Sequence, residues 1–169
     1  MQHDPAFEPT PPDCFPLEAL QAFQRVEACA LLDVNYYLWL NNTDADKPPY
    51  RFLYCLELVF ERQGALLLSS GEDTTAIRII SAETLIRTAR DLQQLHNQVS
   101  IQRVNCAAFP LWQPAVGSPL QAVRLSRNED GYYLNDALVL DFGSWRILVS
   151  LNHQGDGLAL SDYASASHR

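Results

Sequence analysis

The chain has 169 residues, of which 47% are hydrophobic and 19% charged, as expected for a soluble protein with one domain and a core of its own. The formal net charge of −8 and a pI near 4.8 give a surface that repels phosphate. This disfavours nucleic acids and anionic membranes as partners and suits a basic protein partner. No apolar run reaches the roughly 20 residues of a membrane span, and the first residues lack the pattern of a signal peptide. We therefore expect a cytoplasmic protein with reduced cysteines, three of the four being buried.

The N-terminal residues are rich in proline, which fixes the backbone φ angle and has no N–H to donate. Residues 1–16 are therefore predicted to form an extended arm outside the core. Pro16, the last of these prolines, stands where helices prefer to begin. The apolar residues that follow it at helical spacing predict a short helix over 17–24.

A long alternating segment comes next. Apolar side chains occupy every second position of residues 26–40, which predicts one bent strand or a helix end that runs into a strand. Tyr37 and Trp39 fall on the opposite face, as expected if the strand is covered on both sides. Residues 41–49, NNTDADKPP, predict a loop.

Three antiparallel strands are predicted between residues 52 and 80. In residues 52–60 the even-numbered side chains, including Tyr54, are apolar or aromatic and are expected to face the core. A turn that contains glycine, at 61–64, leads to a second strand, and an acidic turn at 71–73 leads to a third strand over 76–80.

The clearest helix signal covers residues 82–96. Apolar side chains recur there at helical spacing, Ser81 is suited to the N-cap, and Glu83 lies in the first turn, where the helix dipole favours an acid. Asn97 is expected to end the helix in a left-handed conformation.

The C-terminal half repeats the strand pattern. A strand is predicted over 99–104, followed by a loop with three prolines at residues 109–119. Four short strands then follow, at 120–125, 137–142, 145–151 and 157–160. Gly143-Ser144 is predicted to form a two-residue hairpin link with glycine first, as a type II′ turn prefers.

The two halves share a motif. Leu-x-Leu-x-Phe followed by a turn occurs at residues 56–60 and again at 138–142. Either the chain contains an internal duplication, or two unrelated meanders share the alternation common to all such strands. The predicted fold is α+β, with a largely antiparallel sheet made of two β-meander units, at about 26–80 and 99–161, and two helices packed on it. Residues 17–163 form the single domain, and 164–169 are expected to form a flexible tail.

No familiar catalytic or cofactor motif occurs in the chain, so we expect no cofactor, no metal and no assigned catalytic residue. Phosphate-binding glycine loops and GxSxG are absent, and no histidine pair has zinc-ligand spacing. Asn42, Asp44 and Asp46 resemble the start of a calcium loop, but Lys47 and Leu53 stand where glycine and glutamate are needed. His96 ends the apolar stripe of its helix and is expected to lie at the core edge.

Two features suggest protein binding. Trp112 lies in a loop made rigid by prolines, where an aromatic side chain makes a good anchor; the alternative is that it plugs the sheet beneath the loop. The other feature is a set of acidic turns, whose carboxylates would attract a basic partner. As the alternative, these carboxylates could serve acid–base chemistry or bind a cation. The candidate partner-binding residues are Trp112, Glu72, Asp73, Glu129, Asp130 and Asp156.

These observations favour a non-catalytic protein-binding module with an acidic surface. In size and charge the chain is similar to the small acidic immunity proteins that neutralise bacterial toxins, an analogy that rests on no shared motif. A protein that binds a small ligand or divalent cation through the acidic turns, an enzyme included, is the second hypothesis. A structural homo-oligomer that pairs through an exposed strand edge is the third.

Overall fold

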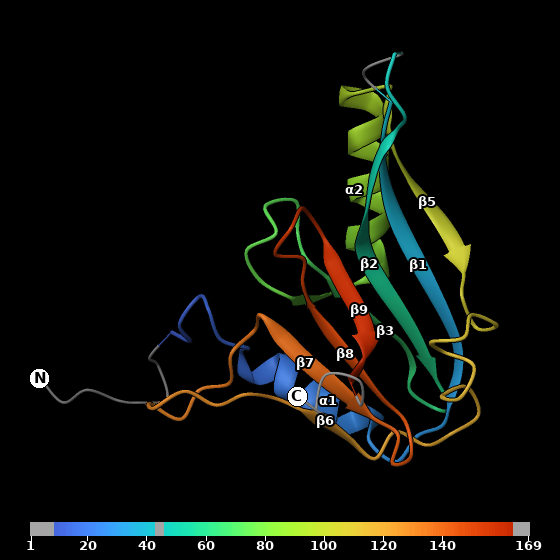
Figure 1. Ribbon diagram of the computed structural model, residues 1–169. Helices are drawn as coiled ribbons and strands as arrows, with labels where there is room; N and C mark the ends of the chain where they lie inside the picture. Colours follow the sequence, from blue (N-terminus) through green and yellow to red (C-terminus); the bar gives the residue numbers. More distant parts are fainter. Residues whose placement is uncertain (1–8, 43–45, 164–169) are drawn as a thin grey trace, which may run out of the picture.

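The computed structural model describes residues 9–42 and 46–163, and it confirms an α+β fold dominated by a curled antiparallel sheet (Figure 1). Two helices and nine strands occur in this part of the chain. In chain order they are α1 (Leu17–Val26), β1 (Leu31–Asn41), β2 (Tyr50–Phe60), β3 (Gly64–Ser69), β4 (Arg78–Ile80), α2 (Ala82–Leu95), β5 (Val99–Asn105), β6 (Ala122–Arg124), β7 (Ala137–Asp141), β8 (Arg146–Leu151) and β9 (Leu158–Asp162).

The sheet is built from two meanders, as expected, but β5, which was expected in the second unit, pairs with the first. Strands β1 to β4 pair consecutively, as do β6 to β9, and β5 returns to pair with the free edge of β1. The meanders join where Leu53 of β2 pairs with Leu158 of β9. Strand β2 is therefore shared, with β1 along one edge and β3 and β9 along the other. The duplication itself stays a hypothesis.

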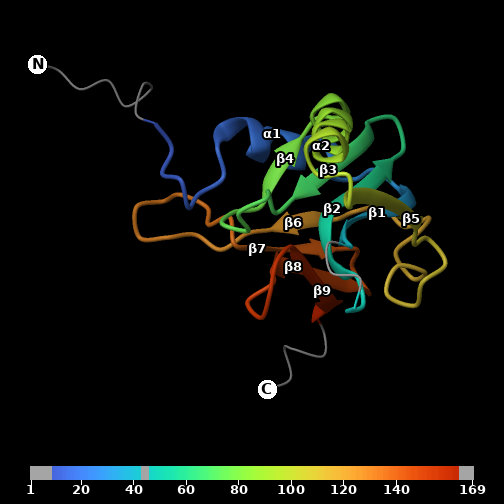
Figure 2. The same cartoon turned by 90° about the horizontal axis from the view of Figure 1, so that it is seen from above.

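The first meander is covered on both faces, as Tyr37 and Trp39 suggested. The main core lies on one face and extends between the two meanders. On the other face α2 covers a second, smaller cluster, in which Leu85 of the helix packs with Cys55 and Leu67. Tyr37 and Trp39 pack against this second cluster. Figure 2 shows α2 lying across the strands of the first meander.

A β-bulge overturns the expected alternation in β2. Tyr37 pairs with Cys55 and the next residue, Leu38, pairs with Leu53, so Tyr54 is an extra residue in β2. Such a bulge exchanges the two faces of the strand on either side of it. Tyr54 consequently belongs to the cluster under α2, whereas Leu56 belongs to the main core.

Of the two predicted ends of α2, the structure confirms only the N-terminal one. The Ser81 hydroxyl accepts a hydrogen bond from the Thr84 amide at 3.1 Å, which confirms the N-cap. The helix ends at Leu95, and His96 is its exposed C-cap residue. Asn97 has no positive φ angle, so the expected left-handed ending is wrong. At the other predicted turn, Gly143 has φ +89°, as the first position of a type II′ turn requires.

The predicted arm is in part a core element. Phe15 is 2% exposed and packs edge-on against Phe23 of α1 at a ring distance of 5.2 Å, and Cys14 is also buried. The Phe15 amide donates to the Tyr133 carbonyl, and Cys14 forms a β-bridge with Leu134. The prolines suppress regular structure, but they leave the apolar side chains between them free to pack. Residues 1–8, the expected tail at 164–169 and the Asp44 position lie outside the described residues.

The four cysteines are unpaired, and three of them are buried, as expected. Within residues 9–42 and 46–163, neither helix is long and apolar enough to cross a membrane.

Candidate functional site

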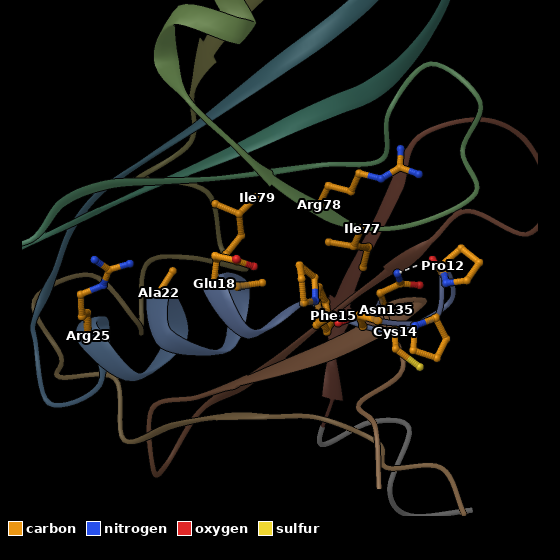
Figure 3. Close-up of a pocket in the computed structure, with 14 residues that line it drawn as sticks. Pro12, Cys14, Phe15, Glu18, Ala22, Arg25, Ile77, Arg78, Ile79 and Asn135 are labelled. Carbon is orange, nitrogen blue, oxygen red and sulfur yellow. Dashed lines mark hydrogen bonds between the residues drawn. The ribbon is translucent and has the colours of Figure 1, made fainter. Parts of the chain in front are cut away.

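A groove with a volume of about 520 Å³ lies between α1 and β4 and is called here the α1–β4 groove. Figure 3 shows its lining, with residues before α1 closing one end. Its volume lies within the range of roughly 300–1,000 Å³ that is typical of ligand sites. The lining residues are Thr10, Pro11, Pro12, Cys14, Phe15, Pro16, Glu18, Ala19, Ala22, Arg25, Ile77, Arg78, Ile79 and Asn135.

The groove exists because α1 presents small side chains to β4. Ala19 and Ala22 lie one turn apart on the same side of the helix, and they are too short to fill the space below Ile77 and Ile79. Figure 3 shows Ala22 on the helix side of the groove and the two isoleucines on the strand side. Phe23, one turn after Ala19, is 2% exposed and anchors the helix in the main core. The helix is therefore held in place without filling the groove.

One side of the groove is the free edge of the sheet, because β4 is the last strand of the first meander. The Ser70 amide donates to Tyr54, which places the backbone groups of Leu67 and Ser69 toward β4. Their partners Ile80 and Arg78 then face β3. The backbone groups of Ile79, which lies between them, face outward. The Ile77 amide also faces outward and donates to the Asn135 carbonyl at 2.8 Å.

Charged side chains lie along an otherwise apolar groove. Glu18 is exposed between its ends, and Figure 3 shows Arg25 and Arg78 projecting at opposite ends. Arg78 lies close to the acidic β3–β4 loop, where its charge is among the causes that lower the pKa of Asp73. The chief cause of that lowered pKa is hydrogen bonding from Thr75, whose amide donates to Asp73 at 3.3 Å.

The structure places two of the three predicted acidic turns next to this groove. Glu72 and Asp73 are exposed in the loop that leads directly into the groove residue Ile77. Glu129 and Asp130 are exposed in the β6–β7 connection, whose Asn128 side chain donates to the thiol of Cys14 at 3.7 Å.

Burial raises the pKa of the Cys14 thiol, and the negative charges of Asp13 and Asp130 raise it further. The Asp130 carboxylate is thus close enough to act on a residue that lines the groove. The two turns come from different meanders, and they meet the groove near the end formed by the residues before α1.

Asp156 lies in the turn between β8 and β9. Its carboxylate accepts a hydrogen bond from the Tyr50 hydroxyl at 2.7 Å, and this bond is the chief reason why the pKa of Tyr50 is raised. The turn touches the β3–β4 loop, since the Gly157 amide donates to the Thr74 hydroxyl at 3.1 Å. The turns of Asp73 and Asp156 are therefore in contact, but each carboxylate has a hydrogen-bond partner of its own.

Trp112 is fully buried, so it is not the exposed anchor that the sequence suggested. It is the plug of the main core, the alternative that the sequence left open. The loop between β5 and β6 turns back over the sheet and carries the indole inside. Its prolines favour this close turn, whereas exposure depends on tertiary contacts that local sequence does not encode.

No three histidine, cysteine, aspartate or glutamate side chains in the described part of the chain could hold a metal ion together. The groove itself was missed from the sequence, because its walls come from segments far apart in the chain. The available signal was the pair Ala19 and Ala22 on one side of a helix. The chain matches no protein-family model, and neither a curated protein nor a solved structure is significantly similar to it.

Proposed function

We propose that this protein is a non-catalytic protein-binding module, and that it binds an extended segment of a basic partner in the α1–β4 groove. The groove that carries the proposal is mostly apolar and is bordered by a free strand edge. Adding a strand to an exposed sheet edge is a common mode of peptide recognition, in which the main chain supplies affinity and adjacent pockets supply specificity. Such a module would act as an adaptor or in the manner of an immunity protein, in the reducing cytoplasm that four free thiols suit.

The backbone of Ile79 supports this mode of binding. Its amide and carbonyl face the groove, and Asn135 already pairs with Ile77 at the same edge, so a ligand strand would continue an existing row of hydrogen bonds. Ala19 and Ala22 leave room for the side chains of that strand on the helix side. An apolar residue of the ligand would fit between Ile79 and Ala22.

Charge supports a basic partner. The protein has a formal net charge of −8, and the Glu72–Asp73 and Glu129–Asp130 turns lie beside the groove. A negative margin around an apolar site speeds the approach of a positively charged partner, and this effect weakens as salt screens the charges. We therefore expect lysine or arginine in the part of the ligand that lies near these turns, and not beside Arg25 at the other end of the groove.

Selection from a random peptide display library tests the proposal with the full chain as bait. Peptides with an apolar centre and a basic segment on one side of it are the expected product, with affinity for the purified protein measured by fluorescence polarisation. The Ala22→Leu variant fills the groove and should weaken binding at least about tenfold, since a ligand side chain loses its place. Raising the ionic strength should weaken binding further.

The control is Gln21→Leu, which introduces the same residue at an exposed position of the same helix that does not line the groove. It should bind the selected peptide as the parent protein does. Circular dichroism establishes that both variants are folded. Failure to select any peptide, or equal binding by Ala22→Leu and the parent protein, would overturn the proposal.

A further inference from the structure

Strand β5 presents the longest bare edge of the sheet. It pairs with β1 over all seven of its residues, Val99 to Asn105, with no register shift, and no strand of the described chain pairs with its other side. In Figure 1 it forms the border of the sheet on the side away from the second meander. The α1–β4 groove lies at a different edge, so pairing through β5 is independent of the proposed function.

Hydrogen bonds at the two ends of β5 establish which of its backbone groups point outward. The Cys106 amide donates to Val34, and the Asn42 amide donates to Gln98, so even-numbered residues exchange hydrogen bonds with β1. Directions alternate along a strand, and the amides and carbonyls of Ile101 and Arg103 therefore point away from the sheet. No hydrogen bond from either amide to another part of the described backbone occurs outside the ladder.

The other edge strands are shorter than β5, which makes its long bare edge exceptional. Strands β4 and β6 have three residues each, and β4 faces α1 across the groove. At β6 the carboxylate of Glu27 accepts the Val123 amide at 3.4 Å. Prolines, lysines and bulges commonly prevent an edge strand from pairing with another chain. Strand β5 has no proline, no lysine and no bulge, and Arg103 is its single charged residue.

We propose that β5 pairs with β5 of a second copy of this chain, antiparallel about a two-fold axis at Gln102. In this register Ile101 faces Arg103 of the second copy and Arg103 faces its Ile101, so all the outward backbone groups of both residues are used. Gln102 faces its own counterpart, and the side-chain amides can pair. A shift of the axis to residue 103 would place the two arginines directly opposite each other, which is unfavourable.

The dimer joins two sheets into one and leaves the two copies of α2 on the same face of it. Val99 and Ile101 lie on that face, where Ile101 packs against the cluster under α2. One strand pair buries less than the roughly 1,600 Å² of a standard interface, so the expected dissociation constant is micromolar or weaker. Formation of the dimer therefore depends on concentration. Two copies of the chain, each with its α1–β4 groove, are held together only where the protein is abundant.

Introducing charges at Gln102 tests the position of the two-fold axis directly. Sedimentation velocity of the parent protein from about 5 µM to about 500 µM should show a reversible monomer–dimer equilibrium. Gln102→Lys and Gln102→Glu each place like charges face to face and should dimerise at least about tenfold more weakly. An equimolar mixture of the two variants should dimerise at least as well as the parent, because the facing charges are then opposite. Gln102 is exposed, so neither substitution disturbs the core.

Hydrogen exchange on the parent protein supplies a second measurement that needs no variant. The amides of Ile101 and Arg103 should exchange more slowly as protein concentration rises, while the Gln102 amide, already bonded to β1, should not change. A parent protein that stays monomeric to about 500 µM would overturn the proposal. So would single variants that dimerise like the parent, or a mixture that does not recover dimerisation.

Discussion

The indole N–H of Trp112 donates a hydrogen bond to the hydroxyl of Tyr36 at 2.6 Å, across 76 positions of the chain. This bond fixes the proline-containing loop to β1 from inside the core. Burial raises the pKa of Tyr36 to about 12, so its hydroxyl stays protonated throughout the physiological range.

Trp112→Ala should therefore act on stability. Loss of a fully buried tryptophan is expected to lower the free energy of unfolding by about 3–5 kcal/mol. Tyr36→Phe removes only the acceptor of the indole N–H and should cost about 1–3 kcal/mol. Urea denaturation measures both. Phe109→Ala, which removes a 41% exposed ring that contacts Tyr36 edge-on, is the control and should cost less than Trp112→Ala.

Asp141 makes the stability of the second meander depend on pH. Burial alone would raise the pKa of this carboxyl, but the Gly143 amide at 2.8 Å and the Arg124 guanidinium at 2.7 Å favour the charged form, and the net effect lowers it. A lowered pKa in the folded state contributes stability above the unfolded value of about 3.9, and that stability is lost as the pH falls through the folded pKa.

Asp141→Asn should thus lower the free energy of unfolding by about 1–3 kcal/mol at pH 7. This value is modest because Arg124 and Arg146 are largely exposed and solvent screens their charges. The difference from the parent should shrink as the pH falls below about 4. Urea midpoints recorded at a series of pH values measure this trend. Asp136→Asn, at an exposed position just before β7, should show no such difference. A constant difference across the whole series would show that the carboxylate charge is not responsible.

Gly157 lies where the two meanders meet. Its φ angle is +83°, and a Cβ atom there would collide with the backbone oxygen of Leu53 and with the ring of Phe52 at 2.6 Å. Gly157→Ala should therefore lower the free energy of unfolding by at least about 3 kcal/mol, because the strained backbone and the collision with β2 both oppose it. Thermal unfolding measures the change.

Gly155→Ala tests the same turn two residues earlier. A Cβ atom at Gly155 meets nothing closer than the Asn152 side chain at 3.4 Å, and its φ angle is unexceptional. This substitution should change the unfolding temperature little. Equal effects of the two substitutions would mean that the turn, rather than the junction of β2 with β9, is sensitive to substitution.

Much of this fold could be predicted from local patterns, because strands and helices with one buried face repeat apolar residues at their own period. Ser81 and Gly143 are local signals of this kind, and the structure confirms both. The bulge at Tyr54 has no such signal, since one extra residue in β2 is defined only by its pairing with β1. The burial of Phe15 was missed because prolines on both sides of it obscured a single apolar residue.

The candidate site was harder to predict for the same reason. The groove depends on the approach of α1 to β4, and neither segment contains information about the other. Charge patterns did locate the acidic turns, but only the tertiary structure shows that Asp73 and Asp130 flank one groove while Asp156 bonds to Tyr50.

The cysteines should differ in reactivity. Burial raises the pKa of Cys14 and Cys55, and it raises that of Cys106 to about 11. The reactive form of a cysteine is the thiolate, so these three should label slowly in the folded protein. Cys29 is partly exposed and should react first with iodoacetamide at pH 8, as read by mass spectrometry of proteolytic fragments. Labelling in urea, where all four should react alike, is the control.

Strand β2 has a consequence for synthesis of the chain. The first meander can pair as it leaves the ribosome, but the part of β2 around Leu53 has its second neighbour only when Leu158 arrives. Until then a strand edge next to Phe52 and Tyr54 stays open, and an open edge of this kind is where nascent chains associate wrongly. The open edge of β2 is therefore covered only when β9 has been translated, and until then the growing chain is prone to aggregate. Slow elongation through β9 would lengthen the time during which chaperones can bind this edge.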